Sequence, residues 1–139
     1  MRSVEDLIEE LKSKYGGSIP FKQICVDEGI VAVKADLEDG VNSFYIASNG
    51  NRVIVLNGHL NYHERRDWAF HELWHHFRSP SGHTKHGDRR QERCADLFAA
   101  LCRIPAVKHG DEVSDLVDRF TVSPVLARIR LEYENRRTR

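Results

Sequence analysis

Residues 71–75 of this 139-residue chain read His-Glu-Leu-Trp-His and lie within a stretch, residues 62–77, that has helical periodicity. Its apolar side chains recur at positions i, i+3, i+4 and i+7 and would form one buried face, which comprises Phe70, Leu73, Trp74 and Phe77. A helix anchored by such a face holds its other side chains in fixed directions. We therefore expect this helix to lie in the core and to present its polar residues to one site.

The two histidines of this stretch have the spacing of a metal site. Residues i and i+4 stack on one face of a helix, so His71 and His75 would present two imidazoles to a point that one Zn²⁺ can occupy. Glu72 lies about 100° further round the helix, where a carboxylate can hold a water molecule without binding the metal. This pattern is typical of zinc peptidases, and the alternative is a surface helix with two histidines and no metal. We predict one catalytic zinc ion per chain and Glu72 as the catalytic residue.

The next predicted helix, residues 89–103, offers the third ligand that a zinc site needs. Catalytic zinc sites commonly have three protein ligands and leave the fourth position to water. Glu92 shares a helix face with two alanines, so this helix can approach the histidine helix closely. Asp96, one turn further on, can accept a hydrogen bond from the far ring nitrogen of His71, although a solvated aspartate paired with an arginine is the alternative. We predict Glu92 as the third ligand and Asp96 as a residue that orients His71.

Three further side chains are candidates for stabilising an oxyanion. His83 and His86 lie three residues apart in a polar loop, residues 79–88, between the two ligand helices. Tyr45 lies in a predicted strand and carries a phenol that can donate a hydrogen bond. Solvated histidines and a packed or exposed tyrosine are the alternatives. His76 points about 100° away from His75, so we expect it to be structural or exposed.

The rest of the sequence predicts short strands and further helices. An Asn-Gly pair at residues 49–50 indicates a hairpin between two β-rich segments. Glycine and proline residues mark the ends of the helices. We expect an α+β fold with a small antiparallel sheet of about three strands packed on helices, divided into a zinc metallopeptidase domain, residues 1–108, and a helical tail packed on it, residues 109–139. The predicted strands are residues 30–35, 41–47 and 52–56, and the additional helices are residues 4–11, 20–29, 111–120 and 124–134.

Composition gives little support to a nucleic-acid or membrane protein. Lysine plus arginine number 21 and aspartate plus glutamate also number 21, so the formal net charge is zero. Nothing global then favours phosphate backbones or an anionic membrane surface. No apolar run is long enough to cross a bilayer, and the first residues are amphipathic and acidic where a signal peptide would be basic and then apolar. We expect a cytoplasmic protein with no membrane partner.

Several segments together resemble the ImmA/IrrE family of metallopeptidases. The match covers most of the chain in order, and it is carried by residues 40–57, 66–75 (RDWAFHELWH), 92–99 (ERCADLFA), 104–105 (Ile-Pro) and 116–131. The resemblance implies that His71, His75 and Glu92 bind zinc, that Glu72 is catalytic, and that Asp96 belongs to the site. It also implies a substrate, because family members typically cut a helix-turn-helix repressor of the lambda-repressor type and so relieve repression. Trp74 departs from the family, which usually has glycine there, and a bulky residue at this position would reshape the cleft wall.

The C-terminal tail leaves two other functions open. Residues 111–120 and 124–134 have the outline of a helix-turn-helix, and arginines make the end of the chain basic, so a DNA-binding regulator with structural zinc is one alternative. Against it, Thr121 lies where such turns favour glycine, and structural zinc sites usually close with four ligands, often cysteines, that this chain does not offer. The other alternative is an antirepressor or toxin-antitoxin partner that binds a repressor without cutting it. We favour the zinc endopeptidase, with the tail used for packing or for gripping the repressor.

Overall fold

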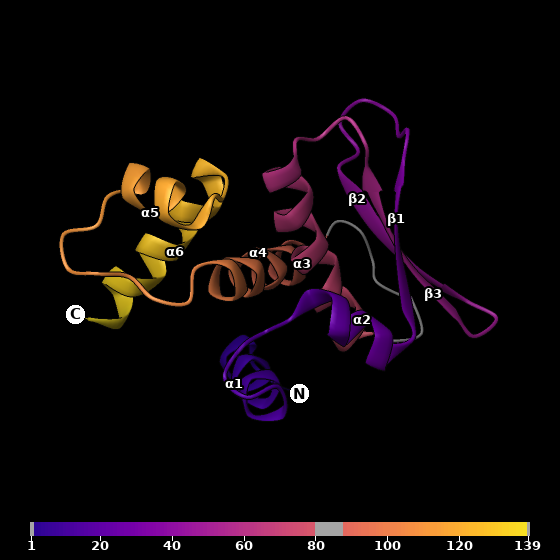
Figure 1. Cartoon of the computed structure of the whole chain (residues 1–139), viewed down its shortest axis with the longest axis horizontal. Helices are drawn as coiled ribbons and strands as arrows, with labels where there is room; N and C mark the ends of the chain where they lie inside the picture. The colour runs from indigo at the N-terminus through magenta and orange to yellow at the C-terminus, as the bar shows by residue number, and fades with distance from the viewer. Residues whose placement is uncertain (1, 80–87, 139) are drawn as a thin grey trace.

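The computed structural model describes residues 2–79 and 88–138, which form six helices and one three-stranded sheet (Figure 1). The α+β class predicted from the sequence is confirmed. Within the described ranges, no helix combines the length and the apolar character that a membrane span requires. The elements in chain order are α1 (Val4–Lys14), α2 (Phe21–Glu28), β1 (Ile30–Ala35), β2 (Ser43–Ser48), β3 (Asn51–Asn57), α3 (Tyr62–Arg78), α4 (Arg89–Arg103), α5 (Val113–Phe120) and α6 (Pro124–Arg137).

The sheet is mixed, so the prediction of a purely antiparallel sheet is wrong. Its strand order is β1-β3-β2, with β3 antiparallel to β2 and parallel to β1. Asn49 and Gly50, both with positive φ, join β2 to β3 in the predicted hairpin. The connection from β1 to β2, residues 36–42, instead places β2 one position away from β1, and β3 fills the position between them. Because Ile54, Val55 and Leu56 of β3 are buried, the central position removes more apolar surface from water than an edge position would.

Helix α3 lies between the sheet and the C-terminal helices (Figure 1), and most of its predicted apolar face is buried. Leu73 is fully buried, and Phe70 and Trp74 are nearly so, while Phe77 is partly exposed. The ring of Trp74 packs against that of Phe98 on α4, with 5.8 Å between the ring centroids. This packing fixes the rotation of α3 about its axis, and with it the direction in which the opposite, polar side points.

The beginning of α3 and its contact with α4 follow from local chemistry. The side chain of Asn61 accepts a hydrogen bond from the backbone N–H of Glu64, and the Glu64 carboxylate accepts one from the N–H of Asn61. This capping box satisfies two backbone donors that the helix itself leaves unbonded. On α4, Ala95 and Ala99 are buried. Their small side chains allow the close approach of α4 to α3 that was expected from the sequence.

The tail lies at the end of the molecule away from the sheet, where α6 packs on α4 and α5 packs on α6 (Figure 1). The Asp67 carboxylate of α3 accepts hydrogen bonds from Nε of Arg103 and from the backbone N–H of Ser123, which caps α6. Arg130 of α6 is buried and donates from Nε to the carbonyl of Ile104 at 2.7 Å. These bonds join α3, α4 and α6. The predicted division of the chain into two parts, between residues 108 and 109, stays a prediction.

Candidate metal centre

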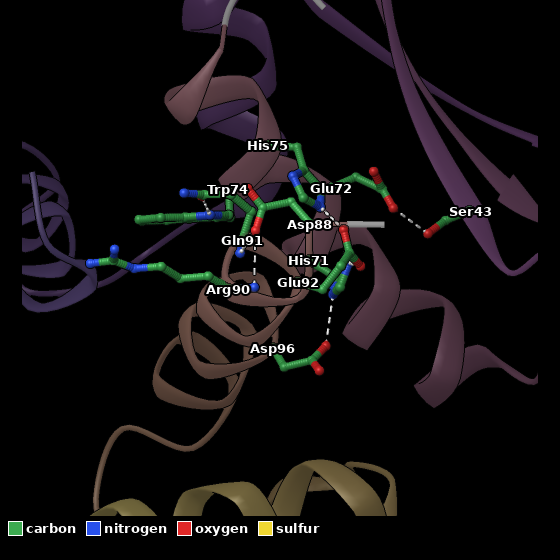
Figure 2. A network of polar contacts seen from close by, with 10 residues as sticks. All are labelled: Ser43, His71, Glu72, Trp74, His75, Asp88, Arg90, Gln91, Glu92 and Asp96. Carbon is green, nitrogen blue, oxygen red and sulfur yellow. Dashed lines mark hydrogen bonds and ion pairs between the residues drawn. The ribbon is translucent and has the colours of Figure 1, made fainter. Parts of the chain in front are cut away.

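Helices α3 and α4 bring His71, His75 and Glu92 together (Figure 2). One donor atom from each of the three side chains lies within 4.8 Å of the other two. Glu92 Oε2 is 2.9 Å from Nε2 of His71, and Glu92 Oε1 is 2.8 Å from Nε2 of His75. Both imidazoles are buried, so their orientation is set by the surrounding side chains rather than by solvent. The arrangement presents two nitrogens and one carboxylate to a common point.

This donor set suits a metal ion with catalytic coordination. Two imidazoles and one carboxylate are ligands that Zn²⁺ accepts, and three protein ligands leave a coordination position for water or substrate. The group of His71, His75 and Glu92 contains no fourth donor that would close the site in the described residues. The cluster therefore fits an open metal site better than a closed structural one.

The charges of the cluster stabilise one another in the absence of metal. Burial lowers the pKa of His71, but hydrogen bonds to Asp96 and Glu92 and the nearby charge of Glu72 outweigh it and raise this pKa to about 9. The hydrogen bond from His71 lowers the pKa of Glu92 and outweighs the opposing effect of burial, and the positive charges of His71 and His75 lower it further. A metal cation that binds His71 takes the place of this proton, because only the deprotonated ring nitrogen is a ligand.

Asp96 lies on the far side of the His71 ring from Glu92 (Figure 2). Its Oδ1 is 2.8 Å from Nδ1 of His71. When Nδ1 donates its proton to this carboxylate, Nε2 is the nitrogen left with a lone pair directed at Glu92 and the metal position. The structure thus places Asp96 in the position expected of a residue that orients His71.

Glu72 lies beside the cluster and is held from the sheet. The residue is only 3% exposed, and the hydroxyl of Ser43, at the beginning of β2, donates to its Oε2 at 2.6 Å (Figure 2). Glu72 lines a cleft of about 460 Å³ together with residues 40–44, His71, Glu92 and other neighbours. Ser43 was not among the candidates from the sequence, because 29 residues separate it from Glu72 and no local pattern relates the two.

The three candidates for stabilising an oxyanion either have a partner other than the metal cluster or lie outside the described residues. The Tyr45 hydroxyl lies 2.8 Å from Nδ1 of His76, and Nε2 of His76 lies 2.8 Å from the carboxylate of Glu28. His76 is therefore structural and buried, and burial lowers its pKa more than Glu28 raises it. This contact directs the Tyr45 hydroxyl toward His76. His83 and His86 lie outside the described residues.

Trp74 contributes to the helix interface. Its indole Nε1 donates to the side-chain oxygen of Gln91 on α4 at 3.3 Å (Figure 2). Its ring is buried against Phe98. The described residues that line the cleft at Glu72 do not include Trp74. The large side chain thus fills space between α3 and α4, and the expectation that it reshapes the cleft wall is not met in this part of the structure.

Comparison with known proteins agrees with this geometry. No curated protein matches the chain. A family model does match: Peptidase_M78, described as the IrrE N-terminal-like domain, covers residues 25–132. That range includes the sheet, both ligand helices, the cleft residues and most of α6. The chain therefore belongs to the ImmA/IrrE family, whose members are metallopeptidases.

Proposed function

We propose that the chain is a zinc-dependent endopeptidase that hydrolyses one peptide bond in a helix-turn-helix repressor of the lambda-repressor type and so relieves repression. The observation that carries this proposal is the position of Glu72. Its buried carboxylate lines the cleft beside the cluster of His71, His75 and Glu92 without belonging to that cluster. A structural metal site would have no use for a second glutamate held beside the cluster in this way.

The metal would be bound by His71, His75 and Glu92. Zinc held there would supply Lewis acidity, which polarises a carbonyl and lowers the pKa of water to about 7. The contribution of the protein is to hold both imidazoles in the orientation that the metal needs. Asp96 performs this for His71 through the hydrogen bond to Nδ1.

Glu72 would act as the general base and then as the general acid. Its carboxylate accepts a proton from the attacking water and then donates that proton to the nitrogen of the leaving amine. Ser43 holds Oε2 and thereby fixes the plane of the carboxylate, so no reorientation is needed before proton transfer. Burial of Glu72 keeps bulk water from competing for the same proton.

The substrate would bind as an added strand along β2. In the order β1-β3-β2 this strand lies at the sheet edge, with β3 on one side only. Residues 40–44, which lead into β2, line the cleft together with His71 and Glu72. An extended peptide that forms main-chain hydrogen bonds there would pass over the metal centre, because the cleft and the strand edge share these residues. A folded repressor would have to present an extended segment to reach this edge.

Family membership supports the repressor as substrate, and a direct experiment tests it. The zinc-loaded protein is incubated with a lambda-type repressor encoded beside it, and the products are identified by mass spectrometry. We expect one discrete cut that disappears when a chelator removes zinc and returns when zinc is restored. An intact repressor that co-purifies with the zinc-loaded protein would contradict hydrolysis and favour the non-cleaving antirepressor.

The DNA-binding alternative has weaker support from the structure. Arg130, one of the arginines that make the tail basic, is buried and bonds to Ile104 and Glu134, so it is not available to phosphate. Arg128 and Arg136 are among the exposed arginines of the tail that remain for such a role. Salt-sensitive binding to duplex DNA that is lost when both are changed to glutamate would favour a regulator, and we expect no such binding.

A further inference from the structure

A second cavity, of about 250 Å³, lies beside the metal centre between α3, α4 and the tail helix α6. Its lining includes Ala99 of α4 and three residues of α6, Val125, Leu126 and Ile129. Asn42, Trp68 and His71 line both this cavity and the cleft that contains Glu72. The two spaces therefore adjoin at the metal ligand His71, and a peptide in the cleft has a side pocket within reach.

The walls of this cavity offer carbon surface, because its acidic groups already have partners. Asp67 accepts hydrogen bonds from Arg103 and from the backbone of Ser123, and Asp96 is bonded to His71. The remaining carboxylate, that of Glu64, accepts the backbone N–H of Asn61 in the capping box of α3. An entering side chain meets the indole of Trp68 and the aliphatic side chains of α4 and α6, and the lining also includes the polar residues Asn42 and Ser123.

Val125 of α6 lines this cavity and is also exposed to solvent. It is a large apolar residue on the first turn of α6 and is 59% exposed, although its neighbour Leu126 is buried. A ligand that covers this exposed valine is stabilised, because apolar surface is then removed from water. The space is smaller than the ~300–1,000 Å³ of pockets that hold whole ligands, and it suits one side chain.

We propose that this cavity, here called the α6 pocket, binds one large apolar side chain of the substrate next to the peptide bond that is cut. The inference rests on the proposed endopeptidase function and assigns part of its specificity to the tail. Leucine, methionine or phenylalanine fits the apolar part of the walls, whereas a charged head group would lose its hydration on entering, where each lining carboxylate already accepts a hydrogen bond. In this reading α6 belongs to the substrate site, and the peptidase needs its tail to recognise a sequence.

Binding is tested first, without turnover. The zinc-loaded Glu72→Gln protein, labelled at valine and isoleucine methyl groups, is titrated with blocked pentaalanine peptides whose central residue is leucine, lysine or glycine. We expect the leucine peptide to shift the NMR signals of Val125 and Ile129 at a concentration at least tenfold below the other two. Equal shifts with all three peptides, or none, would overturn the α6 pocket, and tighter binding of the lysine peptide would replace the apolar occupant by a basic one.

Cleavage specificity is tested second, on a mixture of unfolded proteins whose cut sites are read by mass spectrometry. The wild type should prefer a large apolar residue at one position beside the cut, and Val125→Trp, which fills the pocket, should shift that preference to alanine and glycine. For a leucine substrate we expect kcat/KM to fall roughly tenfold to a hundredfold, mainly through KM. Val31→Trp is the matched control, because Val31 of β1 is also 59% exposed but does not line the pocket.

The two tests separate the pocket from the activity. Leucine-selective binding without any cleavage would refute the endopeptidase function and leave the α6 pocket in place as a binding site. Cleavage with the same residue preference in wild type and Val125→Trp would support the peptidase and overturn the pocket.

Discussion

Asp96 and Glu92 contact opposite nitrogens of the same imidazole, that of His71. Asp96 Oδ1 is 2.8 Å from Nδ1, and Glu92 Oε2 is 2.9 Å from Nε2. The two acidic residues lie one turn apart on α4, so the helix repeat alone sets the distance that spans the ring. One helix thereby provides both a metal ligand and the group that orients a second ligand on the facing helix.

The role of Asp96 predicts a measurable loss of metal affinity. Asn in place of Asp96 keeps the size of the side chain but removes the charge that favours the Nδ1–H tautomer of His71. We expect Asp96→Asn to weaken zinc binding by about 10- to 100-fold in competition with a chromophoric chelator, the range found for such supporting residues. Asp118→Asn, an exposed aspartate of α5, is the control. Equal affinity in Asp96→Asn and wild type would remove Asp96 from the site.

Glu92 should matter more than Asp96, because it supplies a ligand rather than an orientation. Without its carboxylate, His71 and His75 alone would hold the metal. We expect Glu92→Ala to lose zinc on dialysis and to bind it more weakly than Asp96→Asn does, by more than about 100-fold relative to wild type. Metal analysis of the dialysed protein gives the answer, with Glu132→Ala on the exposed side of α6 as the matched variant. Stoichiometric zinc in dialysed Glu92→Ala would show that the third ligand is another residue.

The bond between Ser43 and Glu72 predicts an effect on turnover alone. Ser43 lies 2.6 Å from Oε2 of Glu72 and is not part of the metal cluster. A hydrogen bond to a charged group is worth about 1.5–3 kcal/mol, so Ser43→Ala should lower kcat by roughly tenfold to a hundredfold with zinc content unchanged. The control is Ser48→Ala at the other end of β2. A kcat as high as that of wild type would mean that the cleft positions Glu72 without this serine.

Thr121 carries a backbone strain that a substitution should relieve. This β-branched residue ends α5 with φ 52° and ψ 54°, in the left-handed region that disfavours any residue with a Cβ. That strain costs roughly 1–2 kcal/mol, and the greater freedom of glycine in the unfolded chain offsets roughly 0.5–1 kcal/mol of it.

Thr121→Gly should therefore raise the free energy of unfolding by about 0.5–1 kcal/mol, which amounts to a few degrees in Tm. Thr138→Gly provides the comparison, because Thr138 has φ −94° and gains nothing from glycine. A lower Tm in Thr121→Gly than in wild type would show that the hydrogen bond of its hydroxyl to Phe120 outweighs the strain.

Features set by the helix repeat were accessible from the sequence. The i, i+4 spacing of His71 and His75 and the same spacing of Glu92 and Asp96 place each pair on one face whatever the rest of the chain does. The buried stripe of α3 then orients the histidines, and alanines on α4 permit the approach of Glu92. The relative positions of the two residues within each pair therefore follow from the local sequence of an amphipathic helix.

Features that depend on contacts between distant segments could not be predicted from the sequence. The order of the strands depends on which strand gains most from the central position, and the sequence pattern of a hairpin says nothing about the third strand. The contact of Ser43 with Glu72 and that of Tyr45 with His76 both join β2 to α3, and their residues are 29 and 31 positions apart. Such contacts follow from the tertiary packing of sheet on helix, for which single residues carry no local signal.

In the proposed mechanism Glu72 transfers protons and does not bind the metal. The decisive measurement compares zinc content and repressor cleavage in wild type, Glu72→Gln and the exposed control Glu132→Gln. Because removal of a general acid–base group typically costs 10²–10⁴-fold, we predict that Glu72→Gln keeps one zinc per chain and loses about that factor in kcat/KM, while the control keeps both. Cleavage by Glu72→Gln at the wild-type rate would contradict the role of Glu72 as the group that transfers protons.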